Sequence, residues 1–250
     1  MATSVSGTPK LPDIPSLSNF TGQVLHSSQF GDGREWRDRK VLVFGTGTSA
    51  HDICQDLQGN GADVTMVQRS PTLIINVEPS AQLYDGIYVA EGPSMDDRDL
   101  INASIPLPLL KLAHKEITDK VREIDRPLLD GLEKAGFRLD FGENGTGWPL
   151  KYRNRGGGYY FNVGCSELIV DGRVKLMQYH DIEHFDANGA VLKDGGRKDA
   201  ELIVLATGYK GQMHMVEKLF GDDVAGRVEQ VWGYGEDTQE LTNMWMRPGP

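Results

Sequence analysis

A short apolar run that ends in a glycine-rich turn constrains this chain more than any other feature. Lys40–Phe44 is rich in β-forming residues, a pattern typical of a buried parallel strand. The hexapeptide Gly45–Ala50 follows directly and has the pattern G-x-G-x-x-A. A helical pattern with one apolar face then runs from Ala50 to Leu57. A strand, a turn and a helix in this order predict a dinucleotide-binding βαβ unit.

The small residues of the turn each have a steric role in such a unit. Gly45 permits the tight turn, Gly47 lets a pyrophosphate approach the backbone, and Ala50 keeps the helix close to the strand. The start of the helix offers free N–H groups and a positive dipole end to the phosphates. The predicted cofactor contacts here are Gly45, Thr46, Gly47, Thr48, Ser49 and Ala50. The alternative is a turn of the same shape that binds nothing.

The residues after the next strand, which we predict at Asp63–Gln68, indicate which nucleotide binds. A site specific for NADH usually carries an acid here, which binds the ribose 2′-hydroxyl. This chain has Gln68, Arg69 and Ser70 instead. Arg69 can pair with a 2′-phosphate and Ser70 can donate a hydrogen bond to it, so the sequence favours NADPH over NADH. The alternative is that Arg69 is a solvated surface arginine.

The rest of the chain predicts a mixed α/β protein. Apolar residues between positions 110 and 128 recur at helical spacing and predict a core-facing helix, which Pro127 should break before a second helix at Leu128–Ala135. Residues 72–105 carry no clear signal, and residues 141–158 predict a glycine-rich loop. Later strands are predicted at Tyr159–Val163, Arg173–Met177, Ala190–Lys193 and Leu202–Ala206.

A further motif precedes the first strand. Phe20, Gly22, His26 and Phe30 form the pattern F-x-G-x-x-x-H-x-x-x-F. It resembles the signature of flavin-containing and Baeyer–Villiger monooxygenases, which lies just before their second dinucleotide fold. Phe30 stands where Baeyer–Villiger enzymes usually have Trp or Asp, and this favours the flavin-containing monooxygenases.

The resemblance extends along the chain. Gly45 to Pro71 is similar to the NADPH-binding segment of flavin-containing monooxygenases, and Leu205–Tyr209 resembles their A-T-G-Y strand end, where the chain returns to the flavin domain. That resemblance implies that Ala206, Thr207 and Gly208 also lie at the cofactor. No G-x-G-x-x-G turn precedes residue 45, so the FAD site is expected to be incomplete. Leu241–Pro250 resembles the approach to a last strand that is absent, so the chain is expected to be truncated at both ends.

The implied fold is α/β, a Rossmann-like flavoprotein fold with two dinucleotide-binding domains. Its NADP domain would be complete or nearly so, and only remnants of its FAD domain would be present. The expected parts are a linker and FAD-domain remnant at 1–36, an NADPH-binding domain at 37–206 with a helical insertion near 100–136, and a partial return to the FAD domain at 207–250.

The implied activity is that of an NADPH- and FAD-dependent monooxygenase similar to N,N-dimethylaniline monooxygenase. In that family reduced flavin traps O₂ as a C4a-hydroperoxide, which oxygenates nitrogen or sulfur in a small organic substrate, or a keto acid. No catalytic residue is assigned, because the cofactor carries the chemistry. The alternatives are a chain that binds NADPH and catalyses nothing, and a Baeyer–Villiger enzyme. A reductase of the thioredoxin-reductase type is disfavoured because the chain lacks C-x-x-C.

Composition limits the partners. A net charge of −10 disfavours nucleic acid and a polybasic membrane contact. The two cysteines, at no redox or metal spacing, favour a reducing compartment, and we expect a cytoplasmic chain without a membrane helix. The acidic and histidine side chains of 180–184 need not converge, so no metal site is predicted. The oligomeric state stays open.

Overall fold

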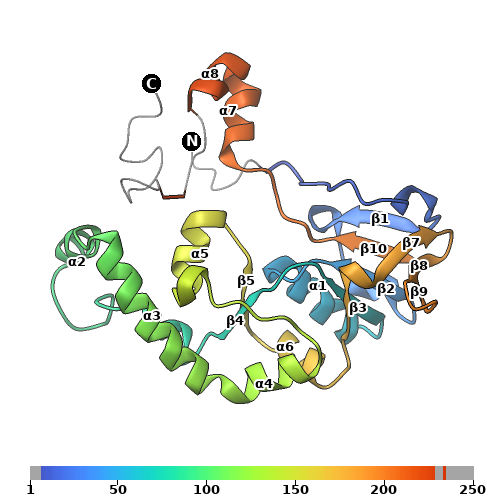
Figure 1. Ribbon diagram of the computed structural model, residues 1–250, viewed down its shortest axis with the longest axis horizontal. Coiled ribbons are helices and arrows are strands. Elements are labelled where there is room, and N and C mark those ends of the chain that lie inside the picture. Colours follow the sequence, from blue (N-terminus) through green and yellow to red (C-terminus); the bar gives the residue numbers. More distant parts are fainter. Residues whose placement is uncertain (1–6, 229–232, 235–250) are drawn as a thin grey trace.

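The computed structural model describes residues 7–228 and 233–234, and a parallel sheet organises them (Figure 1). Its strand order is β1-β10-β2-β3-β6. The strands are β1 (Gln23–His26), β2 (Lys40–Phe44), β3 (Asp63–Gln68), β6 (Lys175–Gln178) and β10 (Leu202–Leu205). Every neighbouring pair in this sheet is parallel, so the carboxyl ends of all five strands lie at one edge.

Alternating side chains divide the core between the two faces of the sheet. Val41 and Val43 pack on the face covered by α1 (Thr48–Gly59), α4 (Arg126–Lys134) and α6 (Cys165–Val170). Leu42 and Phe44 pack on the opposite face, with Phe185 and Ala190 of a small antiparallel sheet. That sheet consists of β7 (Ile182–Asp186), β8 (Gly189–Leu192) and β9 (Arg197–Asp199). Because both faces are covered, β2 is apolar throughout its buried length, as the sequence predicts.

A second, largely helical part of the molecule is built on a parallel strand pair outside the main sheet. β4 (Leu73–Asn76) pairs with β5 (Tyr159–Asn162). Leu73 and Ile75 pack against Val121, with Trp148 and Phe161 closing the cluster. The helices between these strands are α2 (Met95–Ala103), α3 (Leu107–Ile124), α4 and α5 (Gly147–Arg155), which form the left and lower parts of Figure 1.

The remaining elements are short helices and two helices near the carboxyl end. The 3₁₀ turns are Leu17–Asn19, Ser27–Gln29, Gly33–Trp36, Ala81–Tyr84, Glu143–Gly145 and Tyr179–Asp181. After β10 come α7 (Gln212–Phe220) and α8 (Asp222–Val228), which stand apart from the sheet at the top of Figure 1. No helix in the described part of the chain is both long and apolar enough to cross a bilayer.

The predicted loop at residues 141–158 is wrong in part, because it contains α5. The glycines that suggested a loop lie at the two ends of this helix. Gly147 begins it, and Gly156 ends it in the left-handed conformation with φ 65°. Trp148 lies on α5 and packs edge-on against Phe161, at 4.9 Å between ring centroids. Tertiary packing of an aromatic residue thus stabilises a helix that shows little apolar periodicity.

The break at Pro127 is confirmed, whereas the predicted apolar stripe is only partly buried. α3 ends at Ile124, and α4 begins with Arg126, so that Pro127 lies in the first helical turn, where its missing N–H costs nothing. Val121 is buried as expected, but Ile124 is 45% exposed.

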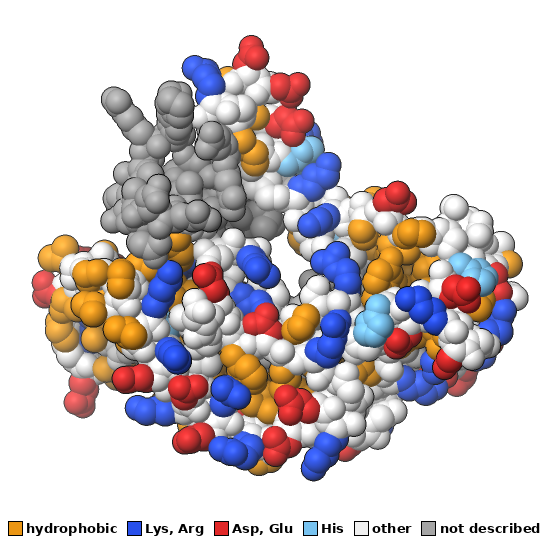
Figure 2. Space-filling view, viewed as in Figure 1, with side chains coloured by type: hydrophobic (Ala, Val, Ile, Leu, Met, Phe, Trp, Pro, Cys, Tyr) orange, Lys and Arg blue, Asp and Glu red, His pale blue; other side chains and the backbone are white. Residues whose placement is uncertain are grey.

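The buried face of α3 is partly polar. His114 and Thr118 are buried because Tyr84 packs on them, with its hydroxyl 2.7 Å from the Thr118 hydroxyl and its ring edge-on to His114. Apolar side chains of α2 and α3 lie on the surface instead, where Figure 2 shows them gathered on the left. Leu100 and Leu112 are the most exposed of them.

Candidate nucleotide-binding site

The predicted glycine turn lies at the carboxyl end of β2, where the strand order changes direction. From β2 the chain proceeds to β3 and β6 on one side, and later returns to β10 on the other. Gly45 has φ 129°, and a Cβ there would collide with the carbonyl oxygen of Ala206 at the end of β10. Only glycine fits this close approach. Ligands of open α/β sheets bind at such a switch point.

The second glycine leaves open space. A methyl group added at Gly47 would meet no heavy atom within 4 Å, and the φ of −87° is ordinary for any residue. Gly47 precedes the first turn of α1, where Thr48 and Ser49 are exposed and where no acidic residue lies. Ala50 is fully buried against the sheet. The turn therefore presents unhindered backbone and a helix N-terminus to an anion.

The side chain of His51 contacts the backbone of this turn from inside the protein. Its side chain is fully buried, and Nδ1 lies 3.1 Å from the carbonyl oxygen of Gly47. Its ring stacks on Tyr160 of β5, with 3.9 Å between centroids and 8° between planes. Burial lowers the pKa of His51 to about 4, so the imidazole is neutral near pH 7 and Nδ1–H donates to Gly47. His51 therefore has a packing role and orients the carbonyl of Gly47.

Residues after β3 lie at the same edge of the sheet as the turn. Arg69 and Ser70 are exposed, as a nucleotide contact requires. Thr46 and Thr72 join the two segments, with 2.5 Å between their buried hydroxyl oxygens. The predicted contacts of the turn and of the second strand are thus brought together, and the Thr46 hydroxyl is engaged in holding them there.

The side chain of Gln68 is buried and holds neighbouring backbone in place. Its side chain is completely buried, its Nε2 donates to the carbonyl oxygen of Arg138 at 2.9 Å, and its Oε1 accepts from the backbone N–H of Arg138 at 2.8 Å. Gln178 at the end of β6 donates to the same Oε1 at 3.0 Å. The side chain of Gln68 thereby places residue 138 beside Arg69. The sequence pattern shows no sign of Arg138 or Gln178, because neither belongs to a local motif.

The end of β10 lies beside the turn through Ala206, but the next two residues are bound to other segments. The hydroxyl of Thr207 donates to the carbonyl oxygen of Lys10 at 2.6 Å. The carbonyl oxygen of Gly208 accepts from the backbone N–H of Lys10 at 2.9 Å and lies 3.0 Å from Nε2 of His26. The segments around residues 10 and 208, which the sequence assigns to the border with a FAD domain, therefore run side by side.

The Phe20–Phe30 motif has a clear steric basis. The ring of Phe20 folds over Gly22, so that a Cβ at Gly22 would collide with the ring. His26 is buried, its Nδ1 accepts from the backbone N–H of Ser28 at 3.2 Å, and its Nε2 therefore donates to Gly208. Phe30 packs against the core on the α1 side. The motif fastens the end of β1 to the end of β10.

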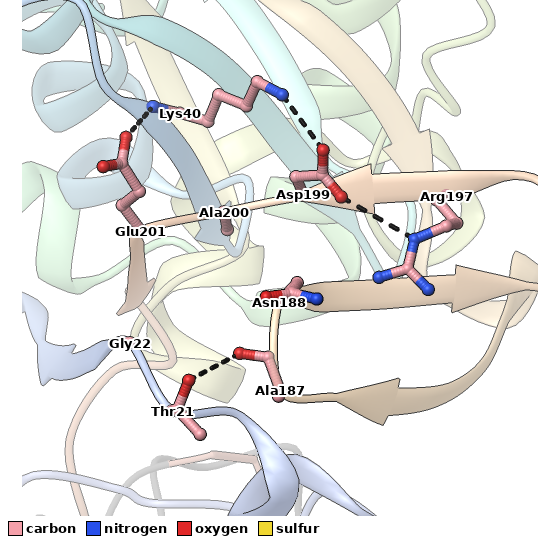
Figure 3. Close-up of a pocket in the computed structure, with 9 residues that line it drawn as sticks. All are labelled: Thr21, Gly22, Lys40, Ala187, Asn188, Arg197, Asp199, Ala200 and Glu201. Carbon is pink, nitrogen blue, oxygen red and sulfur yellow. Dashed lines mark hydrogen bonds and ion pairs between the residues drawn. The ribbon is translucent and has the colours of Figure 1, made fainter.

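A surface depression lies at the opposite edge of the sheet and has no link to the turn (Figure 3). Its charged side chains pair with one another. Asp199 lies 3.0 Å from Lys40 and 3.7 Å from Arg197. The amino ends of parallel strands are not where such sheets bind ligands. The residues His180 and Asp181, 3.3 Å apart, are exposed, and the described residues hold no cluster of three metal-binding side chains.

The comparisons with known proteins agree with this fold. Residues 3–90 match the family model of flavin-binding monooxygenase-like proteins. The chain is 29% identical over 219 residues to probable indole-3-pyruvate monooxygenase YUCCA1 of Arabidopsis thaliana, covering 85% of the chain and 46% of that protein. It is 30% identical over 215 residues to probable indole-3-pyruvate monooxygenase YUCCA4 of Arabidopsis thaliana, in a match that also covers 85% of the chain and 46% of that protein.

A solved structure shows the same architecture. Cyclohexanone monooxygenase from Rhodococcus sp. Phi1 bound to NADP⁺ superposes with a TM-score of 0.56 at 18% identity, over 84% of this chain and 46% of that one. At this identity the likeness concerns the fold. The chain spans about half the length of the relatives it matches. Its sequence is therefore similar to that of flavin-dependent monooxygenases, and its Rossmann-like α/β fold is the one that cyclohexanone monooxygenase shows.

Proposed function

We propose that this chain forms the NADPH-binding part of a flavin-dependent monooxygenase, which acts with FAD and O₂ on a small organic substrate. The observation that carries the proposal is the sheet edge where the open backbone at Gly47, the exposed start of α1 and the exposed Arg69 lie together. The residues fit the cofactor, because a pyrophosphate needs unhindered backbone N–H groups and a 2′-phosphate needs a cation.

The residues at this edge divide the work of holding NADPH. Gly47 and the first turn of α1 bind the pyrophosphate, and His51 keeps the carbonyl of Gly47 directed into the protein. Arg69 and Ser70 bind the ribose 2′-phosphate. When bound, NADPH supplies the hydride that reduces the flavin. The protein's contribution is to fix the nucleotide and to exclude water from the reacting end.

We assign the substrate to the keto acids. The sequence left open an amine, a sulfide or a keto acid, and the relatives named indole-3-pyruvate monooxygenase favour an α-keto acid with an aromatic side chain. The alternative to an active monooxygenase is a chain that binds NADPH but holds no FAD. A visible absorption spectrum of the purified chain separates these two functions, because bound flavin is yellow and NADPH is not.

A substitution at Gly47 tests the site directly. Gly47→Ala adds a methyl group where the folded chain has open space, so the melting temperature should stay within about 2 °C of the wild type. The same methyl group occupies the space that the pyrophosphate needs. We expect the dissociation constant for NADPH, measured by calorimetry, to rise by about tenfold or more.

Gly59→Ala is the matched control, because it lies at the other end of α1 and also faces open space. It should leave NADPH binding unchanged. Equal NADPH affinity in Gly47→Ala and Gly59→Ala would show that the turn does not bind the nucleotide.

A further inference from the structure

A second arginine lies at the end of β3, brought there from a distant part of the chain. Arg138 follows α4 and is partly buried, and its Nη2 donates to the carbonyl oxygen of Arg69 at 2.5 Å. The segment that carries it runs parallel to the residues after β3, through a bridge between Thr72 and Leu139. The carbonyl oxygen of Arg138 also accepts from the backbone N–H of Thr72 at 3.1 Å. The guanidinium of Arg138 is therefore held at the sheet edge that Arg69 occupies.

The donors of Arg138 are only partly engaged. Its Nε is buried and has no hydrogen-bond partner in the described structure. The arginines that pair with carboxylates within residues 7–228 are Arg34, Arg39, Arg122 and Arg197, and neither Arg69 nor Arg138 is among them. Two arginines without acidic partners among the described residues therefore lie together on a chain with a net charge of −10. A guanidinium without a carboxylate partner keeps donor capacity for an anion.

The backbone around Arg138 is fixed independently of its guanidinium. Both backbone polar groups of residue 138 bond to the buried side chain of Gln68, which is itself held by Gln178. Gln68 and Gln178 end the adjacent strands β3 and β6. Because the strands position the backbone, the place of this loop does not depend on the guanidinium of Arg138 alone.

We propose that Arg138 determines the choice of NADPH over NADH, by binding the ribose 2′-phosphate together with Arg69. This inference rests on the proposed function and adds to it a residue from outside the glycine turn and the strand that follows. Two guanidinium groups from different segments can contact different oxygens of one phosphate, which a single arginine on a flexible stem does less rigidly. Bound in this way, Arg138 would act on the 2′-phosphate that distinguishes NADPH from NADH.

Calorimetric titration of Arg138→Met with NADPH and with NADH tests the proposal. Methionine keeps most of the apolar stem and removes the charge. We expect the NADPH dissociation constant to rise by about 10- to 100-fold, because a hydrogen bond to a charged group is lost. The NADH dissociation constant should stay unchanged. Adenosine 2′-monophosphate should likewise lose affinity, whereas adenosine 5′-monophosphate should not.

Arg126→Met is the matched control, since Arg126 is an exposed arginine at the start of the α4 segment. It should bind both nucleotides as the wild type does. If Arg138→Met weakens NADPH and NADH equally, Arg138 has a merely structural role and the proposal is wrong. If Arg138→Met binds both as the wild type does while Arg69→Ala loses the preference, this inference fails and the NADPH site stands. If the folded wild type binds neither nucleotide, the proposed function itself fails.

Discussion

At the scale of single residues, the two glycines of the turn differ in whether the fold requires them. Gly45 is required by the fold, because a side chain there would strike the carbonyl of Ala206. Gly47 is not required by the fold, because the space beside it is open. A residue that folding does not demand, at a position where a ligand would approach, is the clearest local sign of a binding site.

His51 makes the stability of the chain depend on pH. Its folded pKa of about 4 lies below the ordinary value of 6.5, because burial disfavours the charged ring. Between these values the unfolded chain binds the proton more readily, so the free energy of unfolding should fall as the pH falls from 6.5 to 4. The loss from His51 is at most about 3 kcal/mol.

Urea denaturation at a series of pH values measures this effect. His51→Phe keeps a ring against Tyr160 but cannot titrate, so its stability should decline less steeply over the same window. Burial also lowers the pKa of His114 to about 4, and that contribution remains in both proteins. Identical slopes for His51→Phe and the wild type would show that His51 does not carry the effect.

Single residues also show where sequence reasoning ends. Arg69 was predicted from its place directly after the second strand. Arg138 lies 69 positions away and reaches the carbonyl oxygen of Arg69 only because α3 and α4 fold back on the sheet. No local pattern encodes such a pairing, nor the bonds by which Gln68 aligns residue 138.

At the scale of elements, a buried polar network holds the helical part to the strand pair. Asp125 lies between α3 and α4 and is 2% exposed. Its carboxylate accepts from the backbone N–H of Asn76 at 3.0 Å, from the Asn76 side chain at 2.9 Å, and from Ser80 at 2.6 Å. The amide of Asn162 continues the network from Asn76 to Glu167 on α6. One carboxylate therefore links the helix junction to the end of β4.

Asp125→Ala should destabilise the chain strongly, because it leaves the donors of Asn76 and Ser80 buried without an acceptor. We expect a loss of roughly 3 kcal/mol in the free energy of unfolding. Asp130→Ala is the control, since Asp130 is exposed on α4, and it should change stability by about 0.5 kcal/mol or less. Urea denaturation of both variants decides, and equal small losses would contradict the importance of the network.

The elements differ in how well the sequence predicted them. β2, α1 and β3 lie where predicted, because a strand buried on both faces and a helix buried on one leave unmistakable patterns. β1 and α5 were missed. β1 is a short strand with only His26 fully buried, and α5 depends on the packing of Trp148. Their stability comes from partners far away in the sequence, which local periodicity does not record.

At the scale of the whole molecule, the segments proposed to bind the nucleotide lie at one edge of the sheet. The turn after β2, the residues after β3 and the end of β10 meet there because all the strands are parallel. The Rossmann-like α/β fold that the motifs predicted is confirmed. The division of the chain into an NADPH-binding domain and flanking remnants of a FAD domain stays a prediction, as does the contact of each predicted residue with the cofactor.

A preference for NADPH over NADH at this sheet edge is the central claim. Calorimetric titration of the wild-type chain and of Arg69→Ala with both nucleotides tests it directly. We expect the wild type to bind NADPH at least about tenfold more tightly, and Arg69→Ala to lose most of that preference while binding NADH as before. Equal affinities in the folded wild-type chain, or a preference that survives in Arg69→Ala, would contradict the assignment of Arg69 to the 2′-phosphate.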